Sequence, residues 1–330
     1  MAVEEFQEKS IDELLAFLAK WNPDHPELGE GDIVRWQKCY RWVFRYHGDL
    51  IGYIAQIPQT FKYGKPSGRE GTEQIGWGVT LVLDQSPDSE RRRSASLHEL
   101  LTKVEHNPPW QFGAVGVVPE IEQPYLRRGH AIRRDGSKMY ARFIRPSEAL
   151  TYMNKSAALA PLLRLANAVV RPARRADQSA VVRVSQFDPA WDSTWDQILS
   201  DQFELSSVRD AEFLNYKLSQ PNRDYQVYRH VKGGYIIFRL ARHRTRNLSL
   251  VKICDLVAAE PARRDLLAMA MDFTYQSNAA GVVALGSEAE EPIYRKAGLY
   301  IARPYPITMP PHIKARMRVT FFDSDLDNLW

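Results

Sequence analysis

The sequence predicts an α/β (α+β) protein with two domains of one kind, each a mixed sheet flanked by helices. Three observations lead to this prediction. The chain has 330 residues, which suits two domains of ordinary size. Stretches with strand and helix spacing follow one another in the same order in both halves. The halves also share a helix ending, "YLRRGH" and "YRKAGL", in which a tyrosine precedes a glycine by four residues.

The shared helix ending is clearest in "PIYRKAGLYI", residues 292–301. Pro292 can open a helix because its missing N–H would have no partner there, and Gly298 can close it in a left-handed conformation. An aromatic and β-branched strand follows. Tyr125 and Gly129 repeat the pattern, and about half the chain separates the two glycines. This spacing indicates an internal duplication.

The same order of elements can be followed through each half. Two strands come first, joined at Gly48-Asp49 and at Gly233-Gly234, where residues that allow positive φ favour tight hairpins. An apolar strand, an arginine-bearing loop and a helix follow, then another apolar strand, the tyrosine-to-glycine helix and a closing hairpin. In the first half this hairpin comprises "HAIRR", an Asp135-Gly136 turn and "KMYARFI". The order strand, strand, strand, helix, strand, helix, strand, strand is thus predicted twice.

We predict that the two domains span residues 1–150 and 183–330, with a helical linker at 151–182. The linker contains "NKSAALAPLLRLANAVVRPARRADQ", a basic amphipathic helix that should end at Pro172. Such a helix can lie on a membrane surface, but this one is shorter than most helices that do so. A connector packed on both domains is the favoured interpretation.

Composition predicts a globular, cytoplasmic protein without a transmembrane segment. Hydrophobic residues make up 44% and charged residues 25% of the chain, and no stretch is apolar for about 18 residues. The start "MAVEEFQEKS" is acidic, whereas a secretory signal begins basic and continues apolar. Cys39 and Cys254 lie in apolar surroundings without a CxxC partner, which favours reduced, packed thiols.

The charge pattern favours small anionic partners over nucleic acid. The net charge is +4, and the basic residues occur in short scattered groups rather than in one tract interleaved with aromatic residues. The histidines show no HxxxH or HxH pairing, so no metal is expected. Asp323, Asp325 and Asp327 could hold a cation on one face of an extended segment, but an acidic chain end is the favoured interpretation.

Taken together, the repeated order and the helix endings resemble the GNAT acyltransferases, in a tandem form with two GNAT-like domains. The resemblance covers roughly residues 30–150 and 185–325. "IYRKAGLY" is similar to the family's last helix, Leu-Tyr-x-x-x-Gly-Phe, and "YLRRGH" is a looser copy. The resemblance implies a twisted sheet whose central strands splay apart and admit the pantetheine arm of acetyl-CoA or another acyl-CoA. It also implies a small-molecule or sugar-type acceptor.

The resemblance further implies a phosphate-binding turn between a strand and a helix. Unpaired N–H groups and the positive end of the helix dipole attract phosphate there. The family's motif is Gln/Arg-x-x-Gly-x-Gly/Ala. The best fit is Arg91, Arg92, Arg93, Ser94, Ala95 and Ser96, with serines where glycines are expected. A frame starting at Arg92 and a rival motif at Leu126–Ala131 remain open, as does a plain basic loop that caps a helix.

The second half departs further from this motif. Its equivalent turn, "AEPARRDLL", has no glycine. The phosphate site of this half is therefore predicted to be lost, and the acyl-CoA site is assigned to the first half.

Acyl transfer needs a base for the nucleophile and an acid for the departing thiolate. The resemblance gives the acid role to Tyr125, with Tyr294 as the alternative in the second half. Either tyrosine can instead be a half-buried packing residue. Glu73, Asp84 and Glu120 lie near strand ends and are the candidate bases. His98 and His130 are interpreted as packing or surface residues. "WQKCYRWVFRY" is most simply a core strand, although Trp36 and Trp42 could flank an acceptor groove.

The leading hypothesis is an acyl-CoA-dependent N- or O-acyltransferase with an acceptor cleft near the junction of the domains. One alternative is a non-catalytic protein that keeps the fold to bind a partner or ligand. Another is a transferase that uses an aminoacyl-tRNA donor, which the basic pI permits and no motif demands.

Overall fold

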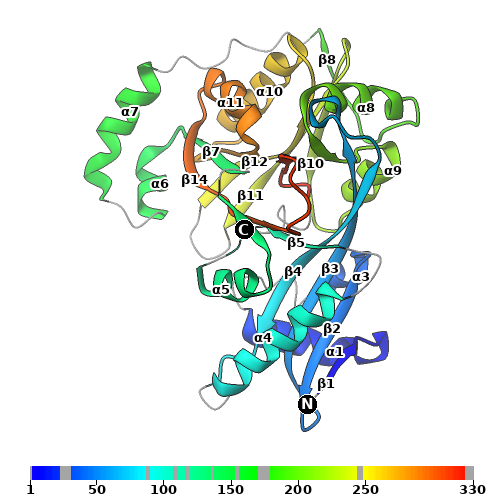
Figure 1. Cartoon of the computed structure of the whole chain (residues 1–330). Helices are drawn as coiled ribbons and strands as arrows, with labels where there is room; N and C mark the ends of the chain where they lie inside the picture. Colours follow the sequence, from blue (N-terminus) through cyan, green and yellow to red (C-terminus); the bar gives the residue numbers. More distant parts are fainter. Residues whose placement is uncertain are drawn as a thin grey trace.

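The computed structural model describes residues 2–22, 31–86, 90–106, 111–115, 117, 119–134, 137–152, 156–169, 179–243 and 248–323. Two mixed sheets form the body of the protein, and helices cover both of them (Figure 1). The predicted fold class, two mixed sheets flanked by helices, is confirmed.

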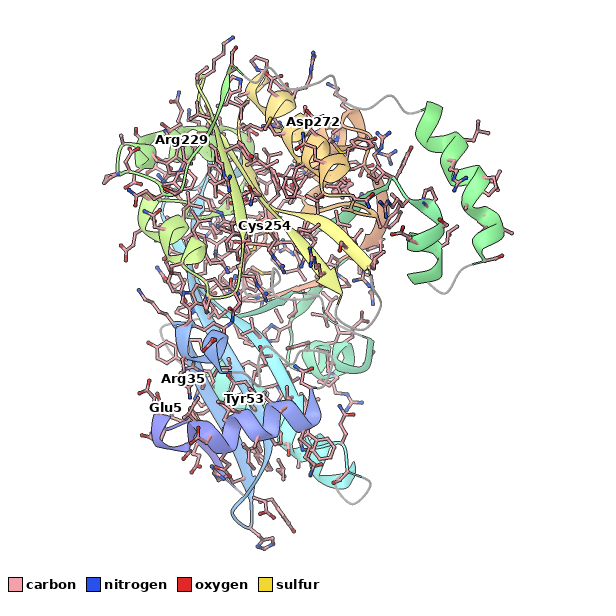
Figure 2. The ribbon with its side chains drawn as sticks, turned by 180° about the vertical axis from the view of Figure 1, so that it is seen from behind. Glu5, Arg35, Tyr53, Arg229, Cys254 and Asp272 are labelled. Carbon is pink, nitrogen blue, oxygen red and sulfur yellow. The ribbon has the colours of Figure 1, made fainter. Side chains whose placement is uncertain are left out.

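The first sheet has the strand order β1-β2-β3-β4-β5-β15-β6, with β9 added beside β3 and β16 beside β9. Its strands are β1 (Ala2–Glu5), β2 (Tyr40–Tyr46), β3 (Asp49–Tyr63), β4 (Thr72–Leu83), β5 (Gln111–Val115), β6 (Ala131–Arg133), β9 (Leu205–Ser207), β15 (Ile307–Met309) and β16 (Met317–Arg318). The associated helices are α1 (Ile11–Trp21), α3 (Asp32–Trp36), α4 (Glu90–Glu105) and α5 (Pro119–Arg127). Figures 1 and 2 show α4 on one face of this sheet and α1 on the other, where Tyr53 packs beneath α1.

The second sheet has the order β14-β7-β13-β12-β11-β10-β8. Its strands are β7 (Lys138–Phe143), β8 (Val181–Arg183), β10 (Tyr225–His230), β11 (Tyr235–His243), β12 (Leu248–Val257), β13 (Gly281–Gly286) and β14 (Tyr300–Pro304). The helices of this half are α6 (Pro146–Tyr152), α7 (Ala160–Val169), α8 (Trp191–Gln202), α9 (Ala211–Leu218), α10 (Ala262–Gln276) and α11 (Glu291–Lys296). Short 3₁₀ helices are η1 (Glu8–Ser10), η2 (Lys65–Ser67), η4 (Ala157–Leu159) and η5 (Glu288–Glu290).

The duplicated order of elements is present in the structure. β2, β3, β4, α4, β5, α5, β6 and β7 correspond in order to β10, β11, β12, α10, β13, α11, β14 and β15. The two helix endings also match, because Gly129 and Gly298 have φ values of +81° and +82°. The residue after each glycine donates its N–H to the tyrosine carbonyl, at 3.2 Å for Tyr125 and 2.8 Å for Tyr294. The glycines therefore close the helices in the predicted left-handed conformation.

The closing hairpin predicted in the first half is wrong, because the two halves exchange their last strands. β6 pairs with β15, and β7 inserts between β13 and β14 in the other sheet. Reciprocally, β15 lies between β5 and β6. The Asp135-Gly136 turn falls outside the described residues. The division at 1–150, 151–182 and 183–330 stays a prediction, and the exchanged strands pair across it.

The connector between the halves differs from the predicted packed helix. α6 contacts β12 and α7 contacts β7 of the second sheet, and α7 extends away from the body of the protein in Figures 1 and 2. Leu159, Leu162 and Leu165 follow one face of this segment and are 43%, 64% and 64% exposed. This apolar face is therefore not packed on both domains.

Within the described residues, no helix combines the length and the hydropathy that crossing a bilayer requires.

Both cysteines match their predicted state. Cys254 is buried, Cys39 is half-buried, and neither forms a disulfide.

Candidate active site

The central strands part in each half of the protein. β4 and β5 are parallel and pair from Ile75–Gln111 to Gly78–Ala114, after which β4 continues along β3 to Leu83. In the second half, β12 and β13 pair from Leu250–Gly281 to Ile253–Ala284, and β12 continues to Val257. We call these two gaps the first cleft and the second cleft.

An irregularity in each long strand accompanies the parting. In β4, the register against β3 shifts between Tyr53 and Ala55, and Thr80 has a φ of +52°. In β12, the register against β11 shifts between Ile237 and Phe238, which leaves Cys254 as the extra residue. A bulge of this kind bends a strand and increases its twist. It therefore directs the far end of the long strand away from its parallel neighbour.

The first cleft leads toward the N-terminal end of α4, which begins earlier than predicted. Arg91, Arg92, Arg93, Ser94, Ala95 and Ser96 lie in its first two turns, so the predicted arginine-bearing loop is helix. The run "ERRRSAS" contains no glycine or proline to stop a helix. The first N–H groups of a helix have no acceptor within it and carry the positive end of its dipole. The side chains of residues 91–94 lie outside the described part.

Two small side chains, Ala95 and Ser96, follow in the first two turns of α4. Ala95 is half-buried, and Ser96 is 1% exposed. The Ser96 hydroxyl has no hydrogen-bond partner among the described residues.

Tyr125 lies on α5 next to the end of β5. It is 2% exposed, and its ring stacks on Phe112 of β5 at a centroid distance of 5.6 Å. Burial, reinforced by the Glu105 carboxylate, raises the pKa of the Tyr125 hydroxyl. A tyrosine hydroxyl is protonated at neutral pH even at its ordinary pKa of about 10, so burial does not create this proton donor but makes it a weaker acid.

A charged cluster packs behind Tyr125. Glu105 of α4 accepts from Arg128 Nε at 3.1 Å and lies 3.1 Å from His130 Nε2. The His130 ring meets the Tyr125 ring edge-on at 5.7 Å, and Arg128 also donates to the carbonyl of His98 at 2.7 Å. These contacts fix α5 against α4 and set the orientation of the Tyr125 ring.

The structure does not bring the candidate bases together. Glu73 is the second residue of β4, and one of its carboxylate oxygens accepts from Tyr63 Oη at 2.8 Å. Asp84 follows the other end of β4, and its Oδ1 accepts from the Ser86 N–H at 2.8 Å. Asp84 lies eleven positions after Glu73 in the chain, which corresponds to about 35 Å of extended strand. Asp84 lies at the parted end and Glu73 at the paired end, whereas the Glu120 side chain falls outside the described part.

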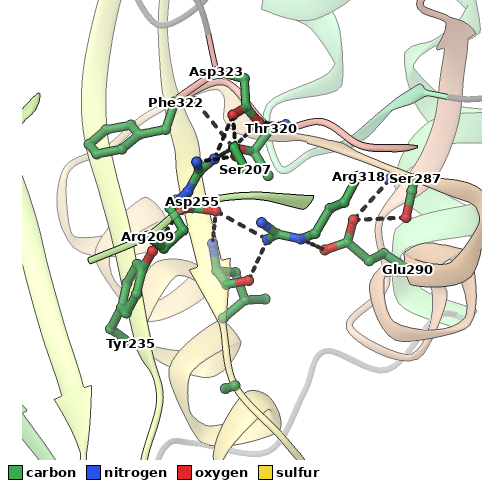
Figure 3. A network of polar contacts seen from close by, with 12 residues as sticks. Ser207, Arg209, Tyr235, Asp255, Ser287, Glu290, Arg318, Thr320, Phe322 and Asp323 are labelled. Atoms are coloured by element: carbon green, nitrogen blue, oxygen red, sulfur yellow. Dashed lines mark hydrogen bonds and ion pairs between the residues drawn. The ribbon is translucent and has the colours of Figure 1, made fainter. Parts of the chain in front are cut away.

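The second cleft is filled by the chain itself (Figure 3). Arg318 donates through Nη2 to the Leu256 carbonyl at 2.6 Å and to Asp255 Oδ1 at 3.1 Å. Its Nε donates to Glu290 Oε1 at 3.1 Å. Asp255 and Leu256 belong to the part of β12 beyond its pairing with β13, and Glu290 ends η5, which follows β13. The Arg318 guanidinium thus bridges the two sides of this gap.

A second arginine extends this buried network. Arg209 donates to Asp255 Oδ2 at 2.6 Å and to Asp323 Oδ1 at 2.8 Å, and Tyr235 Oη donates to Asp255 at 2.7 Å. Burial alone would raise the pKa of Asp255, but Arg209 and Arg318 outweigh it and hold that pKa at about 2. Asp323 is fully buried here, so the prediction of an acidic chain end is wrong for it. Asp325 and Asp327 lie outside the described part.

Sequence analysis missed this network, although one signal for it was available. Asp255 interrupts the apolar strand "LVKICDLVAA". A carboxylate in a buried strand requires a partner, because an unpaired buried charge is too costly.

The two clefts differ in exposure as well as in content. Gly78, Thr80, Leu81 and Leu83 are half-buried along the parted end of β4. In contrast, every residue from Lys252 to Val257 in β12 is buried. Solvent therefore reaches the parted strand of the first cleft and not that of the second.

Across the described ranges, no group of three or more His, Cys, Asp or Glu residues is placed to hold a metal ion.

The fold is similar to those of several solved structures. A probable N-acyltransferase of Enterococcus faecalis is 12% identical, with a TM-score of 0.59 over 93% of this chain and 72% of that one. A GCN5-related N-acetyltransferase of Anabaena variabilis is 13% identical, with a TM-score of 0.57 over 93% and 72%. The N-myristoyltransferase of Saccharomyces cerevisiae with bound myristoyl-CoA is 10% identical, with a TM-score of 0.57 over 93% and 82%.

The chain has a tandem GNAT-like fold. No protein-family model and no curated protein matches the sequence. At these identities the similarity establishes the GNAT-like fold and not the chemistry, so activity has to be argued from the residues of this chain.

Proposed function

We propose that this protein is an acyl-CoA-dependent N- or O-acyltransferase that binds its donor in the first half. The single observation that carries the proposal is the contrast between the clefts. The first cleft is partly open to solvent and leads to a helix N-terminus, whereas Arg318 occupies the second. We therefore expect one donor site per chain.

The residues of the first half suit the chemical parts of acyl-CoA. The start of α4 presents the N–H groups of its first turn, and the arginines at 91–93 add positive charge for the pyrophosphate. The parted edge of β4 offers backbone groups to the amides of the pantetheine arm. Ser96 adds a buried hydroxyl without a partner among the described residues.

Acyl transfer then needs two proton movements. The attacking amine or hydroxyl of a small-molecule or sugar-type acceptor loses a proton, and Asp84 at the parted end of β4 is the proposed base. The thioester C–S bond breaks, and the departing thiolate takes a proton. Tyr125 of α5, whose ring stacks on Phe112 of β5, is the proposed acid, since a tyrosine hydroxyl is protonated at neutral pH.

Calorimetric titration with acetyl-CoA and with free CoA tests the donor site. We expect a stoichiometry of one and a rise in melting temperature, because a ligand that binds only the folded state stabilises it. Replacing Arg91, Arg92 and Arg93 together by alanine should weaken binding. Arg264→Ala is the matched control, because it changes an exposed arginine in the first turn of α10, the equivalent helix of the second half.

Two results would reject the proposal. One is the absence of any heat or melting shift with either compound, which would favour a non-catalytic binding protein. The other is equal loss of binding in the triple variant and in Arg264→Ala. A melting shift with tRNA and none with CoA would instead favour an aminoacyl-tRNA donor.

A further inference from the structure

A pocket of about 270 Å³ lies at the junction of the two halves, away from the parted end of β4. β3 runs through both halves there. β2 pairs with β3 as far as Gln56, opposite Tyr40, and β9 begins to pair at Phe61, opposite Ser207. The edge of β3 between these strands forms one wall of the pocket through residues 57–60.

Aromatic contacts between the halves form the opposite wall. Trp36 of α3 stacks on Tyr216 of α9, with centroids 4.6 Å apart and ring planes 8° from parallel. Trp36 Nε1 donates to Ser219 Oγ at 3.1 Å, and the Lys38 N–H donates to Tyr216 Oη at 2.8 Å. The wall is therefore preformed by contacts between residues far apart in sequence.

Trp42, the other tryptophan considered for an acceptor groove, is in the core instead.

The remaining surface of the pocket is mainly apolar. Ile57, Pro58, Val208, Phe213 and Phe322 line it. A ligand that buries an apolar body against these side chains gains free energy by leaving water.

Most polar side chains in the pocket already have partners. Gln59 accepts from Trp77 Nε1 at 2.7 Å and donates to Asp323 at 2.8 Å. Thr60 bonds to Gln74, and the Asp210 carboxylate caps α9 by accepting from the Phe213 N–H at 2.8 Å. These groups shape the pocket but have little capacity left for a ligand.

Gln37 is the exception. Its side chain lines the pocket and is 6% exposed, yet its Nε2 has no hydrogen-bond partner among the described residues. A buried amide donor of this kind normally finds an acceptor, whether in the protein, in water or in a ligand. An acceptor group placed in the pocket would satisfy it.

Two lysines are among the residues that line the pocket. Lys217 lines the pocket and is 5% exposed, with its Nζ 5.4 Å from the centre of the Phe322 ring. Lys38 is exposed, and its Nζ lies 5.0 Å from the centre of the Tyr216 ring. Two carboxylates also line the pocket: Glu212 is exposed, and Asp210 is half-buried and caps α9. A carboxylate, which only accepts hydrogen bonds and is negatively charged, suits the Gln37 amide donor in a pocket that two lysines also line.

We propose that this pocket binds a small organic carboxylate with an apolar body. The carboxylate accepts from Gln37 Nε2 near the ammonium of Lys217, and the body packs on the apolar wall. The volume is slightly below the range of about 300–1,000 Å³ that holds drug-sized ligands, so the ligand is small. This site goes beyond the proposed donor site, and its test needs no acyl-CoA.

Benzoate and hexanoate are suitable probes, since both combine a carboxylate with an apolar body. Benzamide and benzylamine are the matched neutral and cationic compounds. Saturation-transfer NMR and titration at millimolar concentration should detect both carboxylates, with weaker binding of benzamide and none of benzylamine. Gln37→Leu should weaken benzoate binding about tenfold, because one hydrogen bond to a charged group is lost. Lys38→Met, at an exposed position, should weaken it less.

Gln226→Leu is the control variant. Gln226 is also a buried glutamine, 7% exposed, but it lies on β10 and does not line the pocket. It should leave benzoate binding unchanged. The proposal is overturned if neither carboxylate binds, if benzylamine binds as well as benzoate, or if Gln37→Leu binds like the unsubstituted protein.

Discussion

Replacing Arg318 by methionine should destabilise the protein by about 3–5 kcal/mol. The Arg318 side chain is 1% exposed, and its partners Asp255 and Glu290 are 0% and 5% exposed. Methionine keeps much of the volume but removes the guanidinium, so two buried carboxylates lose a cation and the Leu256 carbonyl loses a donor. Urea unfolding, followed by tryptophan fluorescence at pH 7, measures the change in the free energy of unfolding.

The pH dependence of the free energy of unfolding gives a second measure of the interaction between Arg318 and Asp255. The pKa of Asp255 is lowered from its ordinary value of 3.8 to about 2. A lowered pKa stabilises the folded state above pH 3.8, and this contribution of about 2 kcal/mol is lost as the pH falls toward 2. In Arg318→Met the pKa of Asp255 should lie closer to 3.8. The variant should therefore lose less stability than the unsubstituted protein between pH 5 and pH 2.

Arg316→Met is the matched control. Arg316 also pairs with a carboxylate, Glu204, at 2.7 Å, but its side chain is 77% exposed. An exposed ion pair of this kind contributes about 0–1 kcal/mol. The reasoning fails if Arg318→Met costs less than this control, or if its acid dependence matches that of the unsubstituted protein.

Three further predictions concern single residues. Gly129→Ala should cost about 1 kcal/mol in urea unfolding, because φ is +81° while the space around an added Cβ is open. Gly281→Ala should cost about 3 kcal/mol or more by the same assay, since its Cβ would lie 2.3 Å from the Arg142 carbonyl oxygen on the exchanged strand β7. A smaller loss than for Gly129→Ala would contradict this account of β7. In an acetyl transfer assay, Tyr125→Phe should lower kcat about a hundredfold with unchanged CoA affinity, and Tyr294→Phe should leave kcat unchanged. Equal effects of the two tyrosine substitutions would refute the assignment of Tyr125.

The duplicated architecture could be predicted because its signals are local. The glycines at 129 and 298 determine where helices end, and those at 48, 233 and 234 favour the hairpin turns. All five have positive φ, which side chains disfavour. Glycine at these positions therefore predicts the backbone conformation from the local sequence, and no information about distant partners is needed.

The strand exchange could not be predicted in this way. β6 and β7 have the spacing and the intervening turn residues of a hairpin, but each pairs with a strand more than a hundred residues away. Local propensity does not specify which distant edge a short strand joins. The start of α4 was missed for a related reason, because apolar spacing marks where a helix packs and not where its first turn begins.

The buried network around Arg318 in the second cleft could be predicted only in part, for the same reason. Asp255 is visible in the sequence as a charge within an apolar strand, but its partners at 209 and 318 come from segments on either side of it, some 50 and 60 residues away. The sequence thus indicates that a partner is needed and does not identify it.

The exchange of β7 and β15 also affects how the protein is made. The middle of the first sheet stays open until β15 is synthesised, about 170 residues after β6. At about 5–20 residues per second, a nascent chain therefore carries unpaired edges on β5 and β6 for roughly 10–30 s. A ribosome that stalls before residue 307 leaves both edges exposed to neighbouring chains, so the first sheet becomes protected from aggregation only once β15 has been made.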